Sequence, residues 1–316
     1  MRSCAHAQSM SYVELLLAHG AYYKYERRAK AYDEYFSKKQ LEKWTAERID
    51  IDEVSKLFDF IWKWDRNFKR NDEIFVTVFQ DIFTIFDSIN NYEFNKFHLN
   101  YNKIMSKVSQ IFNKVALYYD DYRYQSTAAS KILHAINPSL YIMWDSKIRE
   151  GILGHRDNRY SNDYSEHFIP KMVKNCNEII QDFIVENNAT DSDFYDFVSG
   201  ASDGKTITKL LDQLNFMTYT MPTYFSAYKK EVESLFLNYK EMDMSKKRGF
   251  WINLLPRNQY RYQKLYAYFI SLLNHARNKT LISANERREI NSKWFNNLED
   301  KEYLINRLEH LIKQNE

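Results

Sequence analysis

The chain has 316 residues, of which 44% are hydrophobic and 28% are charged, and its formal net charge is +3. This composition is typical of a folded globular chain and excludes an intrinsically disordered one. The chain holds only six glycines and four prolines, whereas a many-turned β protein needs these residues at its turns. We therefore expect an all-α, multi-helix globular fold.

The sequence shows no pattern that is typical of a metal site or of a membrane-spanning segment. The two cysteines, Cys4 and Cys176, lack the spacing of a metal or disulfide pair, and the eight histidines form no HExxH pattern. We expect no metal, no cofactor and a reducing, cytoplasmic location. No apolar run is long enough to cross a membrane, so no membrane partner is expected. Residues 1–10 are expected to form a weakly structured leader without the pattern of a signal peptide. The sequence gives no indication of the oligomeric state.

Helical periodicity recurs along the first half of the chain. The segment Tyr12–Gln40 predicts one long or broken helix, with Gly20 as its weak point. A helix capped by Asp50 or Asp52 follows, and Asp72 is the predicted cap of the next. Apolar residues at helical spacing define these two helices, a further helix after residue 100 and the last helix of the chain. In chain order the four sets are Val54, Leu57, Phe58, Ile61; Phe75, Phe79, Ile82, Phe86; Ile104, Val108, Ile111, Phe112, Val115; and Leu304, Leu308, Leu311.

The segment Ser199–Thr206 resembles a phosphate-binding loop, but three residues rather than four separate its two glycines. No buried strand pattern precedes it. We therefore interpret it as a loop that leads into a helix over Ile207–Leu214, with Asp203 or Thr206 near the helix start.

The composition becomes basic near residue 244, which predicts a helical body over residues 11–243 and a basic, aromatic C-terminal helical region over residues 244–316. From Met244 to Thr280 the chain has no acidic residue. Basic residues interleaved with aromatics suit phosphate contacts and base stacking. Alternatively, the basic residues form a solvated helix face and the aromatics point to the core, as Leu265, Phe269 and Leu272 are expected to do. The basic residues are Lys246, Lys247, Arg248, Arg257, Arg261, Lys264, Arg277 and Lys279.

The segment Ser126–Arg149 is the most informative one for chemistry. Ser126 is the predicted cap of a helix that carries Lys131 and stops before Pro138. An apolar passage then leads to Asp145, which is predicted to open the next helix. His134 lies three residues after Lys131 and would be its nearest charged neighbour on the helix surface.

A lysine followed by an aspartate in this arrangement resembles the core of the helix-hairpin-helix DNA glycosylases. The resemblance covers about two dozen residues and implies that Asp145 stabilises positive charge on the sugar as a flipped base leaves. In the bifunctional members of that family the lysine attacks C1′ as a free amine and forms a Schiff base, a role that would fall to Lys131. Trp144, Tyr124 and His134 are then the expected pocket residues, and double-stranded DNA is the expected partner.

The chain departs from the family in two ways. The hairpin segment Leu117–Gln125 contains no glycine, and the spacing from Lys131 to Asp145 is shorter than is usual. Phosphate contacts are therefore expected from Arg123 and the N-terminus of the Ser126 helix, together with the basic C-terminal region. The short spacing favours attack by water over attack by the lysine. Divergent prokaryotic glycosylases of this family act on modified phage DNA, and a modified base and a role in phage defence are expected by that analogy.

Three alternatives remain open from the sequence. In the first alternative, Asp145 is a simple helix cap and Lys131 is a solvated surface residue. In the second, the chain binds nucleic acid without catalysis. In the third, it is a protein-interaction module whose aromatics bury against a partner.

Overall fold

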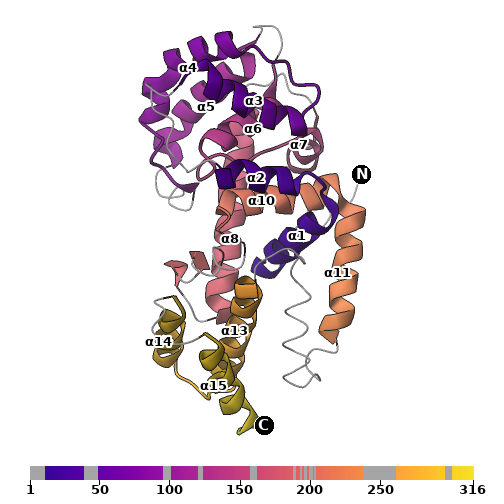
Figure 1. Ribbon diagram of the computed structural model, residues 1–316, viewed down its shortest axis with the longest axis vertical. Helices are drawn as coiled ribbons and strands as arrows, with labels where there is room; N and C mark the ends of the chain where they lie inside the picture. The colour runs from indigo at the N-terminus through magenta and orange to yellow at the C-terminus, as the bar shows by residue number, and fades with distance from the viewer. Residues whose placement is uncertain are drawn as a thin grey trace. The chain divides into compact units, whose positions relative to one another are not determined.

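The computed structural model describes residues 11–38, 49–94, 101–119, 124–156, 162–187, 190–192, 194–195, 198, 202, 204–237, 261–295 and 301–316. Their regular secondary structure is helical, and no strand occurs among them, which confirms the all-α fold class (Figure 1). Two compact units divide the chain: Met1–Ile179 with Thr206–Phe225, and Ile180–Lys205 with Ser226–Glu316. None of the helices in the described ranges is both long enough and apolar enough to cross a membrane. The expected leader, residues 1–10, lies outside the described residues.

The first helical segment is broken, but not at Gly20. Helix α1 (Tyr12–Tyr25) contains Gly20 and ends at Glu26, and α2 (Ala29–Lys38) follows. The Glu26 carboxylate accepts a hydrogen bond from the backbone N–H of Arg28 at 2.8 Å. A side chain that bonds the backbone two residues further along competes with the helical hydrogen-bond pattern, which is consistent with the break at 26–28.

Helices α3 (Ile51–Trp64), α4 (Asp72–Asp87) and α5 (Tyr101–Leu117) pack together as their apolar periodicity predicts (Figure 1). Asp50 caps α3, as expected. Asn71 rather than Asp72 caps α4, because its side chain accepts from the Ile74 N–H at 3.1 Å. The predicted apolar positions of all three helices are buried.

Helix α6 (Ser126–Ile136) packs on α3 and α5 and stops before Pro138, as predicted. Helix α7 (Ser146–Leu153) begins directly after Asp145, and Gly154 ends it with a φ of 84°, a left-handed conformation that glycine adopts without strain. The π-helical turn η3 (Asp163–Phe168) then leads into α8 (Ile169–Asn187).

Helix α10 (Ile207–Asn215) packs against α1, where the His19 ring nitrogen Nδ1 lies 2.8 Å from Gln213 Oε1. Thr206 caps α10 by accepting from the Lys209 N–H at 3.3 Å, which confirms that this loop leads into a helix. The π-helical turn η4 (Phe216–Thr220) and α11 (Pro222–Leu237) follow. All nine residues of α10 are buried, so this helix is a core element of the first unit.

The second unit contains α13 (Arg261–Asn278), α14 (Ala284–Phe295) and α15 (Lys301–Lys313). The Phe269 ring stacks on Trp294 with centroids 4.4 Å apart. In α15, Leu304 and Leu308 are buried as predicted, but Ile312 rather than Leu311 completes the buried face. The boundary expected near residue 244 lies outside the described residues.

Candidate functional site

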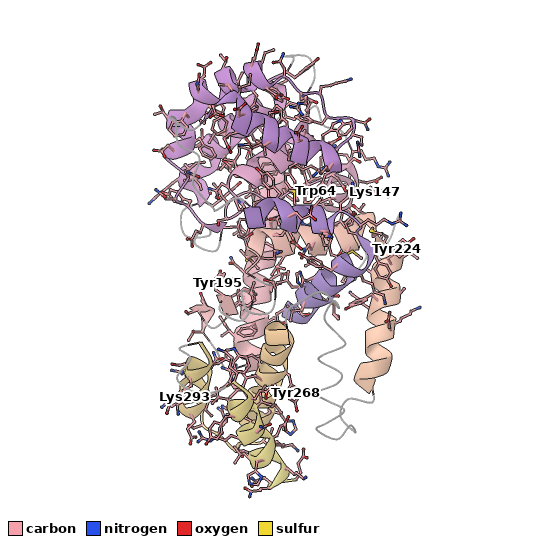
Figure 2. The ribbon with its side chains drawn as sticks, in the orientation of Figure 1. Trp64, Lys147, Tyr195, Tyr224, Tyr268 and Lys293 are labelled. Carbon is pink, nitrogen blue, oxygen red and sulfur yellow. The ribbon has the colours of Figure 1, made fainter. Side chains whose placement is uncertain are left out.

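A pocket of about 300 Å³ lies in the first unit, where the end of α1, the end of α3, α6 and the start of α7 meet. Figure 2 labels Trp64 at the end of α3 and Lys147 in the first turn of α7. Seven charged side chains line the pocket: Glu26, Arg28, Asp65, Arg66, Lys131, Asp145 and Asp212. A concave site with this density of convergent charge is a candidate active or binding site.

Asp145 lies at the head of α7 with both carboxylate oxygens held in place. Its Oδ1 accepts hydrogen bonds from the backbone N–H groups of Lys147 and Ile148, each at 2.8 Å, and its Oδ2 accepts from the Thr220 hydroxyl at 2.8 Å. The prediction that Asp145 opens a helix is confirmed, and the same residue also lines the pocket.

The turn η4 reaches Asp145 because it packs closely on α7. The Tyr219 ring lies where a side chain on Gly151 would stand, so a Cβ at Gly151 would collide with it. Glycine is required here for the close approach rather than for an unusual backbone conformation. This contact places Thr220, the next residue after Tyr219, against the Asp145 carboxylate.

Lys131 points into the same pocket and is not a solvated residue. Its side chain is 14% exposed, and its Nζ lies 3.6 Å from Asp65 Oδ2 and 3.4 Å from the Trp64 carbonyl oxygen. Burial lowers the pKa of the Lys131 ammonium, while the carboxylates of Asp65 and Asp145 oppose that shift. The structure therefore brings Lys131 and Asp145 to one pocket. The alternative that Lys131 is a solvated surface residue is wrong.

Trp144 also lines the pocket, although most of its ring is in the core. Its indole Nε1–H donates to the Ser126 carbonyl oxygen at 3.1 Å, and its ring packs edge-on against Tyr164 at 5.2 Å. The Trp144 backbone N–H donates to the Ser130 hydroxyl at 3.2 Å. These bonds fix the apolar passage that carries Asp145 to the pocket wall.

Three other predicted site residues lie elsewhere. His134 does not line the pocket but is buried in the core, where its Nδ1 lies 2.6 Å from the Tyr141 carbonyl oxygen and its Nε2 lies 2.9 Å from the Tyr32 hydroxyl. Burial lowers the pKa of His134 to about 3, so it is a neutral core residue and not a charged neighbour of Lys131. Tyr124 donates to Asn113 Oδ1 at 2.7 Å, outside the pocket.

Ser126, the third of them, does not cap α6 and does not face solvent. It is 1% exposed, and its hydroxyl accepts a hydrogen bond from the Arg149 guanidinium. Gln125 precedes the helix without a side-chain cap bond. The Ser126 hydroxyl is thus engaged by Arg149, and the phosphate contact expected at the N-terminus of this helix stays a prediction.

The predicted basic surface falls largely outside the described residues. Arg123, Lys246, Lys247, Arg248 and Arg257 belong to segments that the structure does not describe, and only the backbone is described for Arg261. Tyr268 and Phe269 of the same region, however, are fully buried, and the Tyr268 hydroxyl donates to Glu309 at 2.7 Å. These two aromatics are core residues of the second unit, as in the alternative interpretation of this segment.

Sequence reasoning missed the ion pair between Glu26 and Arg28, two of the residues that line the pocket. The Arg28 guanidinium donates to Glu26 through Nε at 2.7 Å and through a terminal nitrogen at 2.8 Å, and it also donates to the Trp64 carbonyl oxygen at 3.2 Å. Burial alone would raise the pKa of Glu26, but the hydrogen bonds from Arg28 outweigh it and lower that pKa. The pair holds the end of α1 against the end of α3.

A second missed pair lies on α10. Lys209 and Asp212 are both buried, and the Lys209 Nζ lies 2.7 Å from Asp212 Oδ2. A lysine three residues before an aspartate is usually an exposed pair on a helix surface. Nothing in the local sequence signals its burial, because burial here comes from the packing of α1 on α10.

Comparisons with protein-family models, with curated proteins and with solved structures found no match to this chain.

Proposed function

We propose that the chain is a nucleic-acid N-glycosylase, which takes a flipped base into the pocket beside Asp145 and breaks its bond to the sugar. The observation that carries this proposal is the convergence of Lys131 and Asp145 on one pocket, with the aspartate fixed at a helix N-terminus. A pocket of about 300 Å³ has room for a nucleobase and part of its sugar.

Asp145 would act on the sugar. When the C1′–N bond breaks, its electron pair leaves with the base, and positive charge develops over C1′ and the ring oxygen. A preorganised carboxylate that is partly shielded from water stabilises that charge without having to reorient. The bonds from α7 and Thr220 hold Asp145 in one orientation, which is the requirement for this role.

Water is the proposed nucleophile. Its oxygen bonds to C1′, its proton passes to a carboxylate, and the departing base takes up a proton, so an abasic site and a free base result. Burial favours the neutral amine of Lys131, but Asp65 at 3.6 Å favours the ammonium. In the ammonium form the lysine has no free electron pair for attack, and it would instead contact the sugar or a phosphate oxygen.

The experiment incubates the full chain with unmodified DNA and with DNA from phages that carry modified bases, and then probes for abasic sites with an aldehyde-reactive label. The proposal predicts abasic sites in at least one of these DNAs. DNA binding without abasic sites in any of them would contradict it and favour a non-catalytic binding protein. Absence of both would favour a protein-interaction module.

A further inference from the structure

Asp212 is a further carboxylate of the pocket, besides Glu26, Asp65 and Asp145, and one of its oxygens has no donor from the described residues. The residue is 6% exposed and lines the pocket from α10. Its Oδ2 accepts from Lys209 at 2.7 Å. Among the described residues, no side chain or backbone N–H donates to Oδ1 of Asp212. Oδ1 is not among the fully buried, unpartnered atoms of the described residues, so it is accessible from the pocket that Asp212 lines. An occupant of the pocket can therefore donate a hydrogen bond to it.

Lys209 holds this carboxylate rigidly from behind. The side chain of Lys209 is 1% exposed, and its ammonium lies over the rings of Tyr32, Tyr22 and Trp64, with distances to the ring centroids of 4.3, 4.8 and 4.9 Å. The negative faces of aromatic rings stabilise a desolvated cation at such distances. Burial raises the pKa of Asp212, and the ammonium of Lys209 opposes that rise. Because Lys209 is held by three rings and bonds Oδ2 of Asp212, the other carboxylate oxygen, Oδ1, has a fixed position as an acceptor.

We propose that Asp212 selects the occupant of the pocket by accepting a hydrogen bond from an exocyclic amino group on its ring. This inference rests on the proposed function in one respect, namely that the occupant is a nucleobase. An amino group projects from the edge of the ring and can reach a recessed oxygen. The ring N–H of uracil or thymine lies between two carbonyl oxygens, and both would be pushed toward the carboxylate. Adenine, cytosine and guanine derivatives are thus the substrate class, and uracil and thymine are disfavoured.

The test compares matched pairs of bases that differ by one amino group. Single-stranded oligonucleotides of thymine would carry one central adenine, cytosine or guanine, or the deamino counterpart, namely purine, pyrimidin-2-one or hypoxanthine. Thymine flanks contribute no exocyclic amino group. Binding to the full chain is followed by fluorescence anisotropy. We expect at least one amino base to bind about 10- to 100-fold more tightly than its deamino partner, because the partner cannot make the hydrogen bond to a charged acceptor.

Two variants then assign that preference to Asp212. Asp212→Asn keeps an acceptor but removes its charge, so the preference for the amino base should shrink. Because this variant leaves Lys209 buried without its partner and could fail to fold, the double variant Lys209→Met with Asp212→Leu replaces the ion pair by apolar side chains. In the double variant the preference should fall to about 1. Glu150→Gln, an exposed charge change on α7, is the control and should keep the wild-type preference.

Equal affinity for all three wild-type pairs would overturn the inference, and so would a double variant that keeps the wild-type preference. The abasic-site assay is read separately on the same protein. Amino preference without base release contradicts only the proposed function, and base release without amino preference contradicts only the role of Asp212.

Discussion

At the scale of single residues, the pocket combines groups whose charges are fixed by different means. A helix N-terminus and Thr220 hold Asp145, and the carboxylate of Asp65 faces Lys131. Asp212 pairs with the buried Lys209, whose ammonium lies over three aromatic rings. Each charge thus has a partner, which offsets part of the cost of removing it from water. What remains open to an occupant is the space between these groups.

Lys131→Ala distinguishes the two possible nucleophiles. If water attacks C1′, borohydride traps no crosslink between the wild-type protein and DNA, and the abasic product stays intact. We expect this result because the spacing from Lys131 to Asp145 is short, and because the Asp65 carboxylate, 3.6 Å from Nζ, stabilises the ammonium against the burial that lowers its pKa. A crosslink that forms in the wild type and is absent in Lys131→Ala would instead make the lysine the nucleophile. Lys147→Ala, an exposed lysine on α7, is the matched control.

His134 makes stability depend on pH. The Tyr141 carbonyl can only accept, so Nδ1 carries the proton, Nε2 accepts from Tyr32, and the ring is neutral. The pKa of His134 is about 3 in the folded chain, whereas an unfolded histidine titrates near 6.5. Between these values the unfolded chain binds the extra proton, so the free energy of unfolding falls as pH falls, by up to about 1.4 kcal/mol per pH unit.

Urea unfolding at pH 7, 6 and 5 measures this dependence. His134→Gln retains hydrogen-bonding groups but does not titrate, so the decline of the unfolding free energy with falling pH should be shallower than in the wild type. If both proteins declined equally, His134 would not be the group responsible.

At the scale of elements, the close packing of η4 on α7 positions the catalytic candidate. Gly151→Ala should destabilise the fold by about 1–3 kcal/mol, because the new methyl group collides with the Tyr219 ring and overpacking exceeds the gain in helix propensity. The same variant should displace Thr220 from Asp145. Thermal unfolding checks the effect, and Gly151→Ala combined with Tyr219→Ala removes the collision. A single variant as stable as the wild type would show that α7 and η4 adjust without cost.

Much at the element scale was predictable from the sequence. Apolar spacing located α3, α4 and α5, Pro138 marked the end of α6, and Asp145 marked the start of α7. The break after α1 was harder to foresee. There the Glu26 carboxylate accepts from the Arg28 backbone N–H, and this side-chain bond competes with the helical backbone bonds.

The candidate site was predictable only where its residues are near in sequence. Lys131, Trp144 and Asp145 lie within one short segment, and the structure places all three at the pocket. Asp65 and Asp212 reach it from α3 and α10 through long-range packing, which no local pattern encodes. His134 lies in the core rather than at the pocket, and Ser126 is buried rather than a helix cap, because a histidine and a serine beside an apolar helix face fit a buried position as readily as an exposed one.

At the scale of the whole molecule, the basic segment beyond residue 244 is predicted to supply much of the affinity for nucleic acid. Changing Lys246, Lys247 and Arg248 together to alanine should weaken binding to all sequences alike. The slope of log affinity against log salt should fall by about 0.7–0.9 for each phosphate that the protein no longer neutralises. Titrations at several salt concentrations check this. An unchanged slope would show that these residues do not touch nucleic acid, and it would favour the protein-interaction alternative.

The central claim is that the Asp145 carboxylate stabilises charge on the sugar, and one measurement tests it most directly: the single-turnover rate of base release by Asp145→Asn on a DNA that the wild type cleaves. Asparagine still caps α7, so folding and DNA binding should be retained, while the rate should fall by about two to three orders of magnitude because the negative charge is gone. Glu150→Gln removes a charge from the exposed side of the same helix and should react at the wild-type rate. Base release by Asp145→Asn at the wild-type rate would contradict the claim and leave Asp145 as a helix cap alone.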